Sequence, residues 1–273
     1  MGHIVVVRPL LALALAALLS SCAMPTGTTP PTIRVLVPYV GQGTGAIVAQ
    51  GERAIAFDAG PDSSAALADL LRREGVVRVD VLFVSHWDLD HVGGLDALLS
   101  RGAVSSIVHG SEPAEAWMRA RKDAWCRRIP GGCILARSGT SIGVLGSMRT
   151  EIVHARPDAS TDNERGLVAR LVDARNEGVL LAPGDIDTAS EAALVERGAH
   201  LRSRVLLVGH HGSRGASSLA FLGQVAPEVA VIQAGIANGY GHPHVEATER
   251  LRALVSRVRR LLPGETEIVT FPP

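Results

Sequence analysis

Residues 79–95 read VDVLFVSHWDLDHVGGL and combine an apolar run with four side chains that can bind a metal ion. Residues 79–84 predict a buried strand, and a helix is predicted to begin at Val92. Buried carboxylates and imidazoles are costly unless they are paired or metal-bound, so the intervening loop favours a metal site. The alternative is that one aspartate caps the helix and the other polar side chains are solvated. The four candidates are His86, Asp88, Asp90 and His91.

Apolar runs alternate with helical patterns from residue 33 onward, without a second change of composition or an internal repeat. One domain is therefore expected over residues 33–273. Predicted strands lie at 33–40, 46–49, 54–57, 79–84, 106–109, 143–153, 166–172, 179–182, 205–208 and 229–233. Predicted helices lie at 63–74, 92–99, 112–122, 188–197, 217–225 and 245–259. This order predicts an α/β fold of two packed sheets with helices outside, an αββα sandwich.

The composition is that of a folded protein with balanced charge. Of the 273 residues, 47% are hydrophobic, and 27 basic residues balance 27 acidic ones. Lys122 is the only lysine, so nearly all of the positive charge is arginine. This balance argues against a broad, nonspecific nucleic-acid surface, although it leaves room for a local arginine-lined groove.

The N-terminus has the pattern of an export signal. Arg8 precedes an apolar run at residues 10–19, which is too short to span a membrane. The run ends in LSSC, residues 19–22, which resembles the lipobox of bacterial lipoproteins. That resemblance implies lipidation of Cys22 and a membrane-anchored protein at the outer membrane or the periplasmic face. An ordinary signal peptide cleaved near Ala23 is the alternative.

Two short segments follow from this interpretation of the N-terminus. Residues 1–22 are expected to form the signal peptide. Residues 23–32, AMPTGTTPPT, are rich in proline and threonine and predict a flexible tether between the lipid and the domain.

Two further cysteines stand in WCRRIPGGC, residues 125–133. In an exported protein, Cys126 and Cys133 are expected to form a local disulfide across the Pro-Gly-Gly turn. Two free buried thiols are the alternative. A metal role is disfavoured because the spacing fits no common zinc motif.

The pattern H-x-D-x-D-H-x-G-G after an apolar strand resembles the metal motif of the metallo-β-lactamase superfamily, with Asp88 in place of the second histidine. Residues 180–185, LLAPGD, resemble the superfamily's L-x-x-G-D motif, and residues 208–213, VGHHGS, resemble its H-H-G-S motif. Asp185 has an alternative role as the cap of a helix near Thr188. The three motifs in this order favour the metal interpretation over the capping one.

This resemblance implies two metal ions and assigns their ligands. The ligands of the first ion would be His86, Asp88 and Asp185. The ligands of the second ion would be Asp90, His91, Asp185 and His211. His210 would then lie beside the substrate, although the two neighbouring histidines could exchange roles.

A closer resemblance covers nearly the whole mature chain. The segments that carry it are 40–43 (VGQG), 57–61 (FDAGP), 85–95 (SHWDLDHVGGL), 162–163 (DN), 182–187 (APGDID), 209–218 (GHHGSRGASS) and 238–243 (NGYGHP). Together they resemble the hydrolase domain fused to the DNA-uptake channel ComEC of naturally competent bacteria. Three features depart from the pattern: Glu164 stands where serine is usual, Gly239 stands where arginine is common, and the context of His154 fits a strand end rather than a ligand.

The resemblance implies an exported hydrolase of phosphodiester bonds that uses two divalent ions, zinc or manganese, and a metal-bridging hydroxide as its nucleophile. Asp88 adds a hard anionic oxygen ligand, which favours phosphate-type substrates. His210 and His242 could supply the proton that a leaving alkoxide needs. The predicted catalytic residues are Asp90, His210 and His242.

The expected partners are an anionic substrate, such as a phosphodiester or DNA, and a membrane held through the lipid; no protein partner is expected. Ser213, Arg214 and Tyr240 are predicted to contact the substrate. Two alternatives remain open. One is a hydrolase of lactams, lactones or thioesters, which Asp88 and the lack of a suitable cysteine ligand disfavour. The other is a non-catalytic surface lipoprotein, which the intact set of candidate ligands disfavours.

Overall fold

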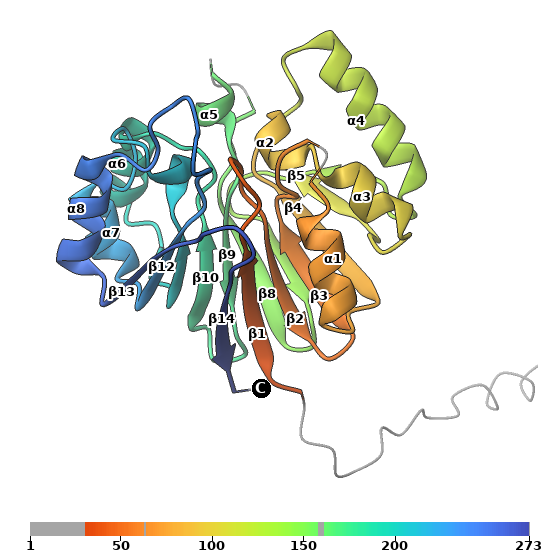
Figure 1. Ribbon diagram of the computed structural model, residues 1–273, viewed down its shortest axis with the longest axis horizontal. Helices are drawn as coiled ribbons and strands as arrows, with labels where there is room; N and C mark the ends of the chain where they lie inside the picture. The colour runs from red at the N-terminus through yellow and green to blue at the C-terminus, as the bar shows by residue number, and fades with distance from the viewer. Residues whose placement is uncertain (1–30, 63, 158–160, 273) are drawn as a thin grey trace, which may run out of the picture. The chain divides into compact units, whose positions relative to one another are not determined.

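The computed structural model describes residues 31–62, 64–157 and 161–272 of the chain (Figure 1). The expected signal peptide, Cys22 and all but the last two residues of the expected tether lie outside the described residues. Residues 31–273 form one compact unit. Within the described ranges, no helix has both the length and the apolar character that crossing a membrane requires.

Two seven-stranded sheets form the framework of this unit. The first contains, in spatial order, β14 (Thr266–Phe271), β1 (Ile33–Pro38), β2 (Ala46–Gln50), β3 (Arg53–Phe57), β4 (Arg78–Val84), β5 (Ile107–His109) and β6 (Cys133–Leu135). The second contains β13 (Arg257–Arg260), β12 (Val229–Ile232), β11 (Val205–Leu207), β10 (Gly178–Ala182), β9 (Val168–Val172), β8 (Met148–His154) and β7 (Ser141–Val144). Both sheets are mixed: β3 to β6 and β10 to β13 run parallel, and the other pairs are antiparallel.

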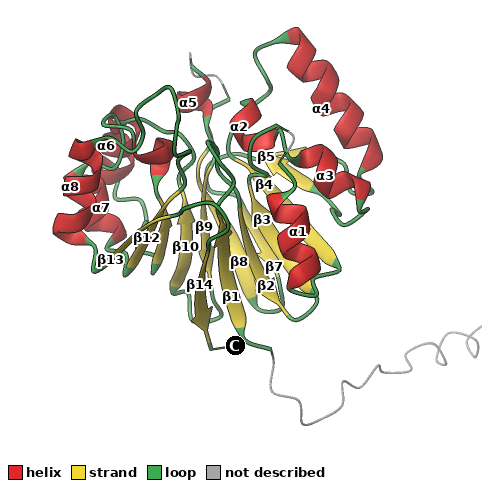
Figure 2. Ribbon diagram, in the orientation of Figure 1, coloured by secondary structure: helices red, strands yellow, loops and turns green. Residues whose placement is uncertain are grey.

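Helices cover the outer faces of the two sheets (Figures 1 and 2). On the first sheet lie α1 (Ala66–Arg73), α3 (Leu95–Ser100) and α4 (Ala116–Arg128). On the second sheet lie α6 (Thr188–Glu196), α7 (Leu219–Val225) and α8 (Val245–Leu254). The short helices α2 (Leu89–Val92) and α5 (Asp162–Arg165) lie at one end of the sheets. The predicted single-domain αββα sandwich is therefore confirmed.

Strand β4 shows why an uninterrupted apolar run was needed to form this sandwich. Val81 and Phe83 belong to the core between the two sheets, whereas Leu82 and Val84 belong to the core beneath α1 and α3. A strand that is buried on both faces carries apolar side chains at every position rather than at alternate ones. The polar residues that follow β4 consequently emerge at the end of a fixed, fully buried element.

The structure differs from the predicted elements mainly at the edges of the sheets. The predicted helix at 245–259 ends at Leu254, and β13 follows it. This strand was missed because it reads RVRR and has little apolar periodicity. Arg257 and Arg259 instead form ion pairs with Glu267 of β14. The short strand β6 and the C-terminal strand β14 were also missed.

Two predicted elements are interrupted by glycine. The predicted strand at 143–153 is a hairpin of β7 and β8, whose turn contains Gly146 with a φ of 70°. The predicted helix at 92–99 corresponds to α3, which begins only at Leu95 because Gly93 and Gly94 separate it from the short helix α2. Glycine is required at Gly146 by its positive φ, whereas Gly93 and Gly94 have right-handed backbone angles and are required by close backbone contacts.

Gly93 and Gly94 allow the loop after β4 to lie against the chain that leaves β3. A Cβ atom on Gly94 would lie 2.1 Å from the carbonyl oxygen of Ala59, and one on Gly93 would lie 2.1 Å from the backbone nitrogen of Asp62. Backbone hydrogen bonds join the same segments, because the Ala59 N–H donates to the His91 carbonyl at 2.7 Å. The two glycines therefore fix the position of the loop that carries the candidate ligands.

This close approach predicts that Gly94→Ala lowers the free energy of unfolding by about 1–3 kcal/mol or more, because the added methyl group must push backbone apart. Gly223→Ala is the matched control, because Gly223 lies within α7 and a Cβ there meets no atom within 4 Å. The control is expected to raise the free energy of unfolding by about 0.5–1 kcal/mol. Urea unfolding followed by circular dichroism measures both; an unchanged stability of Gly94→Ala would contradict the packing argument.

Candidate metal centre

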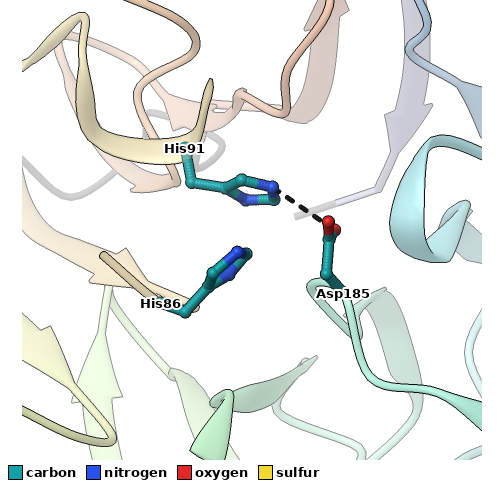
Figure 3. A group of neighbouring side chains, drawn as sticks. All are labelled: His86, His91 and Asp185. Carbon is teal, nitrogen blue, oxygen red and sulfur yellow. Dashed lines mark ion pairs between the residues drawn. The ribbon is translucent and has the colours of Figure 1, made fainter. Parts of the chain in front are cut away.

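The candidate ligands gather at the strand ends where the two sheets meet. His86 follows β4 of the first sheet, and Asp185 follows β10 of the second sheet. Figure 3 shows His86, His91 and Asp185 pointing toward one another from these two sides. His211 lies in the 3-10 turn η1 (Gly209–Gly212), which follows β11. Residues more than 100 positions apart in the sequence thus form one cluster.

Two groups of three side chains have ligand atoms within 4.8 Å of one another. One group consists of His86, His91 and Asp185, and all three are buried. The other consists of Asp90, His91 and His211. His91 therefore belongs to both groups, whereas the family resemblance had implied that it is a ligand of the second ion alone.

Asp185 is a member of the first group and also lies close to His211 of the second group. Its Oδ1 atom is 3.3 Å from His91 Nε2, and its Oδ2 atom is 3.6 Å from His211 Nε2. The proposed capping role of Asp185 is not seen, because Asp187 caps α6 by accepting a hydrogen bond from the Ser190 N–H at 2.8 Å. A buried carboxylate that faces imidazoles with both oxygens is placed to bridge two cations.

The remaining residues of the first loop lie at the rim of the cluster. The Asp88 side chain is 51% exposed, and its Oδ2 atom is 3.5 Å from His86 Nε2. Asp90 Oδ2 is 3.1 Å from His211 Nε2. Asp90 does not cap a helix: Asp88 occupies the N-cap position of α2, and its side chain forms no capping hydrogen bond. The capping alternative for this loop is therefore wrong.

His210 and His242 border the cluster without joining either group. His210 Nε2 is 3.8 Å from Asp185 Oδ2, and its ring lies 5.6 Å from that of His242. Burial lowers the pKa of the His210 imidazole. Burial and the neighbouring imidazoles of His210 and His211 lower the pKa of His242 to about 4. Both side chains are therefore neutral at neutral pH in the protein without bound ligands.

An important residue to which the sequence had assigned no role is Asp58. Its Oδ2 atom is 2.8 Å from His91 Nδ1 and accepts a hydrogen bond from the Ser85 hydroxyl at 2.8 Å, and its Oδ1 atom accepts one from the Ser85 backbone N–H at 2.8 Å. A carboxylate can only accept, so His91 Nδ1 donates and its Nε2 faces the cluster. His211 is oriented in the same way, because its Nδ1 donates to the Gln233 carbonyl at 3.1 Å.

Three residues of the centre have left-handed backbone conformations, which residues other than glycine rarely adopt. The φ angles are 54° at Asp58, 49° at His210 and 53° at His211. Such conformations cost on the order of 1–3 kcal/mol each and persist where the surrounding structure imposes them. Their concentration at this cluster indicates that the placement of these side chains is under functional constraint.

The carboxylates of the centre are strongly held in the charged form. Burial opposes the charge on Asp185, but the imidazoles of His91 and His211 lower the pKa of its carboxyl well below the usual range. Burial likewise opposes the charge on Asp90, but the hydrogen bond with His211 and the charge on His91 lower its pKa to about 2. The centre is thus a buried set of anionic oxygens and imidazole nitrogens.

Buried polar atoms without a hydrogen bond indicate that this set fits a metal. Within the described part of the chain, His86 Nε2, His91 Nε2 and Asp185 Oδ1 are buried and form no hydrogen bond, and the nearest approach among them is the ion pair of His91 Nε2 with Asp185 Oδ1 at 3.3 Å. Buried polar atoms are nearly always satisfied, so three such atoms facing one another indicate an absent partner. Imidazole nitrogens and carboxylate oxygens are common ligands of divalent ions such as zinc.

The predicted substrate residues lie outside these groups. Tyr240 is exposed, and its ring lies 5.7 Å from that of His242. The Arg214 guanidinium is exposed and lies 3.7 Å from the Glu246 carboxylate. Ser213 Oγ accepts a hydrogen bond from the Gly215 N–H at 3.3 Å. The structure thus places Tyr240 beside a histidine of the centre, whereas the contacts of Ser213 and Arg214 lie within their own loop and with α8.

Two other sequence features have clear structural outcomes. Cys126 and Cys133 form a disulfide that joins α4 to β6. His154 lies buried at the end of β8, where its Nε2 donates to the Glu164 carbonyl at 3.0 Å. His154 is in neither candidate ligand group.

The αββα sandwich and the buried cluster of histidines and aspartates at its strand ends define a class of metal-binding proteins, and comparison with known proteins identifies the family. A family model of the metallo-beta-lactamase superfamily matches residues 38–235. The chain belongs to this superfamily.

Individual relatives are more specific. The chain is 34% identical to competence protein ComA of Neisseria gonorrhoeae over 226 aligned residues. The alignment covers 80% of this chain and 29% of that protein. The chain is 28% identical over 201 residues to ComE operon protein 3 of Bacillus subtilis (strain 168), covering 71% of this chain and 25% of that protein. The chain thus spans less than a third of the length of these relatives.

A solved structure shares the fold. It is that of Igni18, described as a novel metallo hydrolase from Ignicoccus hospitalis KIN4/I, with a TM-score of 0.58 and 19% sequence identity. The superposition covers 87% of this chain and 99% of that chain.

The orienting role of Asp58 predicts that Asp58→Ala weakens zinc binding about 10–100-fold, because His91 loses the group that fixes its ring and tautomer. Zinc affinity is measured by competition with a chromophoric chelator. Asp69→Ala is the control, because the Asp69 side chain is 60% exposed and lies on α1. Equal affinities of Asp58→Ala and the unmodified protein would show that Asp58 does not support a metal ligand.

Proposed function

We propose that the protein is an exported, lipid-anchored hydrolase of phosphodiester bonds that uses two divalent ions, zinc or manganese. The observation that carries the proposal is the position of Asp185, which faces His91 with one oxygen and His211 with the other. A carboxylate in this position suits a pair of ions. Two ions suit phosphoryl chemistry, because they stabilise both the attacking and the leaving oxygen.

The ligand sets follow from the two groups. In this proposal, the first ion would be held by His86, Asp88 and Asp185. His91 belongs to the same group and lies close enough to serve as a further ligand of this ion. The second ion would be held by Asp90, His91, Asp185 and His211. When bound, the ions supply Lewis acidity: they lower the pKa of a water molecule toward neutrality and polarise the oxygens of the substrate.

The chain's own residues orient the ligands and move the proton. Asp58 and the Gln233 carbonyl hold the rings of His91 and His211 with Nε2 toward the centre. His210 and His242 stand beside the centre as neutral imidazoles. An anionic diester next to them raises their pKa values, because an opposite charge stabilises the imidazolium form. Either side chain would then take up a proton from solvent and pass it to the leaving alkoxide, returning to the neutral imidazole.

Asp88 favours a phosphodiester over a lactam in this proposal. It contributes a hard, anionic oxygen at the rim of the first group, 3.5 Å from His86 Nε2. Hard oxygen ligands suit the ions that act on phosphates. The similarity to two competence proteins supports an exported enzyme that acts on nucleic acid, although the chain matches only part of each relative.

Activity of the metal-loaded protein tests the proposal. Protein that begins at Cys22 and is reloaded with Mn²⁺ or Zn²⁺ is expected to cleave bis-p-nitrophenyl phosphate or single-stranded DNA, and Asp185→Asn is expected to reduce cleavage to background. The matched control is Asp187→Asn, which keeps a side chain suited to capping α6 and leaves the centre intact. Turnover of nitrocefin without cleavage of any phosphodiester would reject the proposed function in favour of lactam hydrolysis.

The lipid anchor is tested separately. Expression of the full chain in a bacterial host is expected to place the protein in the membrane fraction, and Cys22→Ala is expected to release it, because the acceptor of the lipid is lost. Immunoblots of soluble and membrane fractions provide the measurement. Unchanged partitioning of Cys22→Ala would reject lipidation at this residue.

A further inference from the structure

Two exposed aromatic side chains border the candidate metal centre. Trp117 is 54% exposed and Tyr240 is 68% exposed, whereas Trp87 and Trp125 are buried. Both exposed rings line one cleft of about 440 Å³, and Asp88 and Asp90 of the candidate centre line the same cleft. Large aromatic surfaces left exposed beside a site indicate a contact with a ligand.

Trp117 is held on a fixed element. It lies in the first turn of α4, next to Met118, which is buried beneath the helix. Further along α4, Trp125 is buried and its Nε1 donates to Asp96 at 3.0 Å. The disulfide from Cys126 ties the end of the helix to β6. The exposed ring is therefore presented by an anchored helix, which reduces the conformational entropy that binding must overcome.

The charges around the cleft determine which part of a substrate it accepts. Its lining includes the carboxylate of Glu115 next to Trp117 and, toward the ions, the proposed ligands Asp88 and Asp90; among the described residues, no lysine or arginine lines it. An anionic phosphate is therefore not attracted to the aromatic part of the cleft and lies at the ions instead. An uncharged, flat group suits the aromatic part, because it stacks on a ring without bringing negative charge to carboxylates.

We propose that Trp117 and Tyr240 bind an unpaired nucleobase of the substrate beside the scissile phosphodiester. This inference rests on the proposed function and specifies its substrate class. A base on the cleft and the adjoining phosphate at the ions would select single-stranded nucleic acid over a small diester. A base in a duplex is stacked between its neighbours and cannot lie against these side chains.

Binding is tested without hydrolysis. The probe is a dithymidine dinucleotide joined by an uncharged methylphosphonate, added to the zinc-loaded protein. It is expected to quench tryptophan fluorescence, because Trp117 is the exposed one of the three tryptophans. Calorimetry is expected to show affinity about tenfold or more weaker in Trp117→Ala, since a stacked base contributes about that factor or more. Trp117→Phe keeps a ring and is expected to restore most of the affinity.

Catalytic selectivity provides a second measurement. The substrates are dithymidine phosphodiester and the same diester without its bases, and the readout is the ratio of their kcat/KM values. Trp117→Ala and Tyr240→Ala are each expected to lower this ratio about tenfold. Val77→Ala is the control, because Val77 is 65% exposed but precedes β4, at the end of the strand away from the candidate ligands.

The outcomes separate this inference from the proposed function. Probe affinity that is equal in Trp117→Ala and the unmodified protein overturns the inference, whether or not the protein cleaves diesters. Affinity that depends on Trp117 in a protein that cleaves no diester supports the base-binding cleft and rejects the proposed function. A Trp117-dependent dimer in light scattering, with no binding of the probe, overturns the inference in favour of contact between two copies.

Discussion

The contact of His91 with two buried carboxylates is the interaction on which the rest of the centre depends. Asp58 Oδ2 lies 2.8 Å from Nδ1 of this ring, and Asp185 Oδ1 lies 3.3 Å from Nε2. An imidazole without solvent contact cannot satisfy both nitrogens by itself, and two buried carboxylates would repel each other without a cation or a proton between them. The carboxylates raise the pKa of His91 against the effect of burial, and the same field attracts a divalent ion.

The fold holds this arrangement by bringing strand ends together. Asp58, His86 and Asp185 follow β3, β4 and β10, and each of these strands is buried on both faces. Gly184, with a φ of 60°, lies so close to Ser85 that a Cβ atom would be 2.7 Å from the serine Cβ. The two sheets thus meet where the ligands emerge. The same strands therefore form the core of the sandwich and position the ligands of the centre.

Local sequence was enough to predict the features that depend on local pattern. The apolar run of β4 and the spacing from His86 to His91 predicted a buried strand followed by a metal loop. Asp58 has no neighbouring polar cluster, and its role comes from a strand that is distant in the sequence from His91, so its function became visible only in three dimensions. The position of Trp117 beside the centre could not be predicted for the same reason, because long-range packing places its helix α4 there. The edge strand β13 was missed for a different reason: its stabilisation comes from pairing with β12 and from ion pairs with Glu267 rather than from apolar periodicity.

The central claim is that Asp185 lies between two metal ions, and a crystal structure of the zinc-loaded protein tests it most directly. Anomalous diffraction recorded above and below the zinc absorption edge locates each ion without reference to activity. Two peaks per chain are predicted, one beside His86 and one beside His211, with an oxygen of Asp185 directed at each. A single peak, or two peaks that Asp185 does not contact, would contradict the binuclear centre.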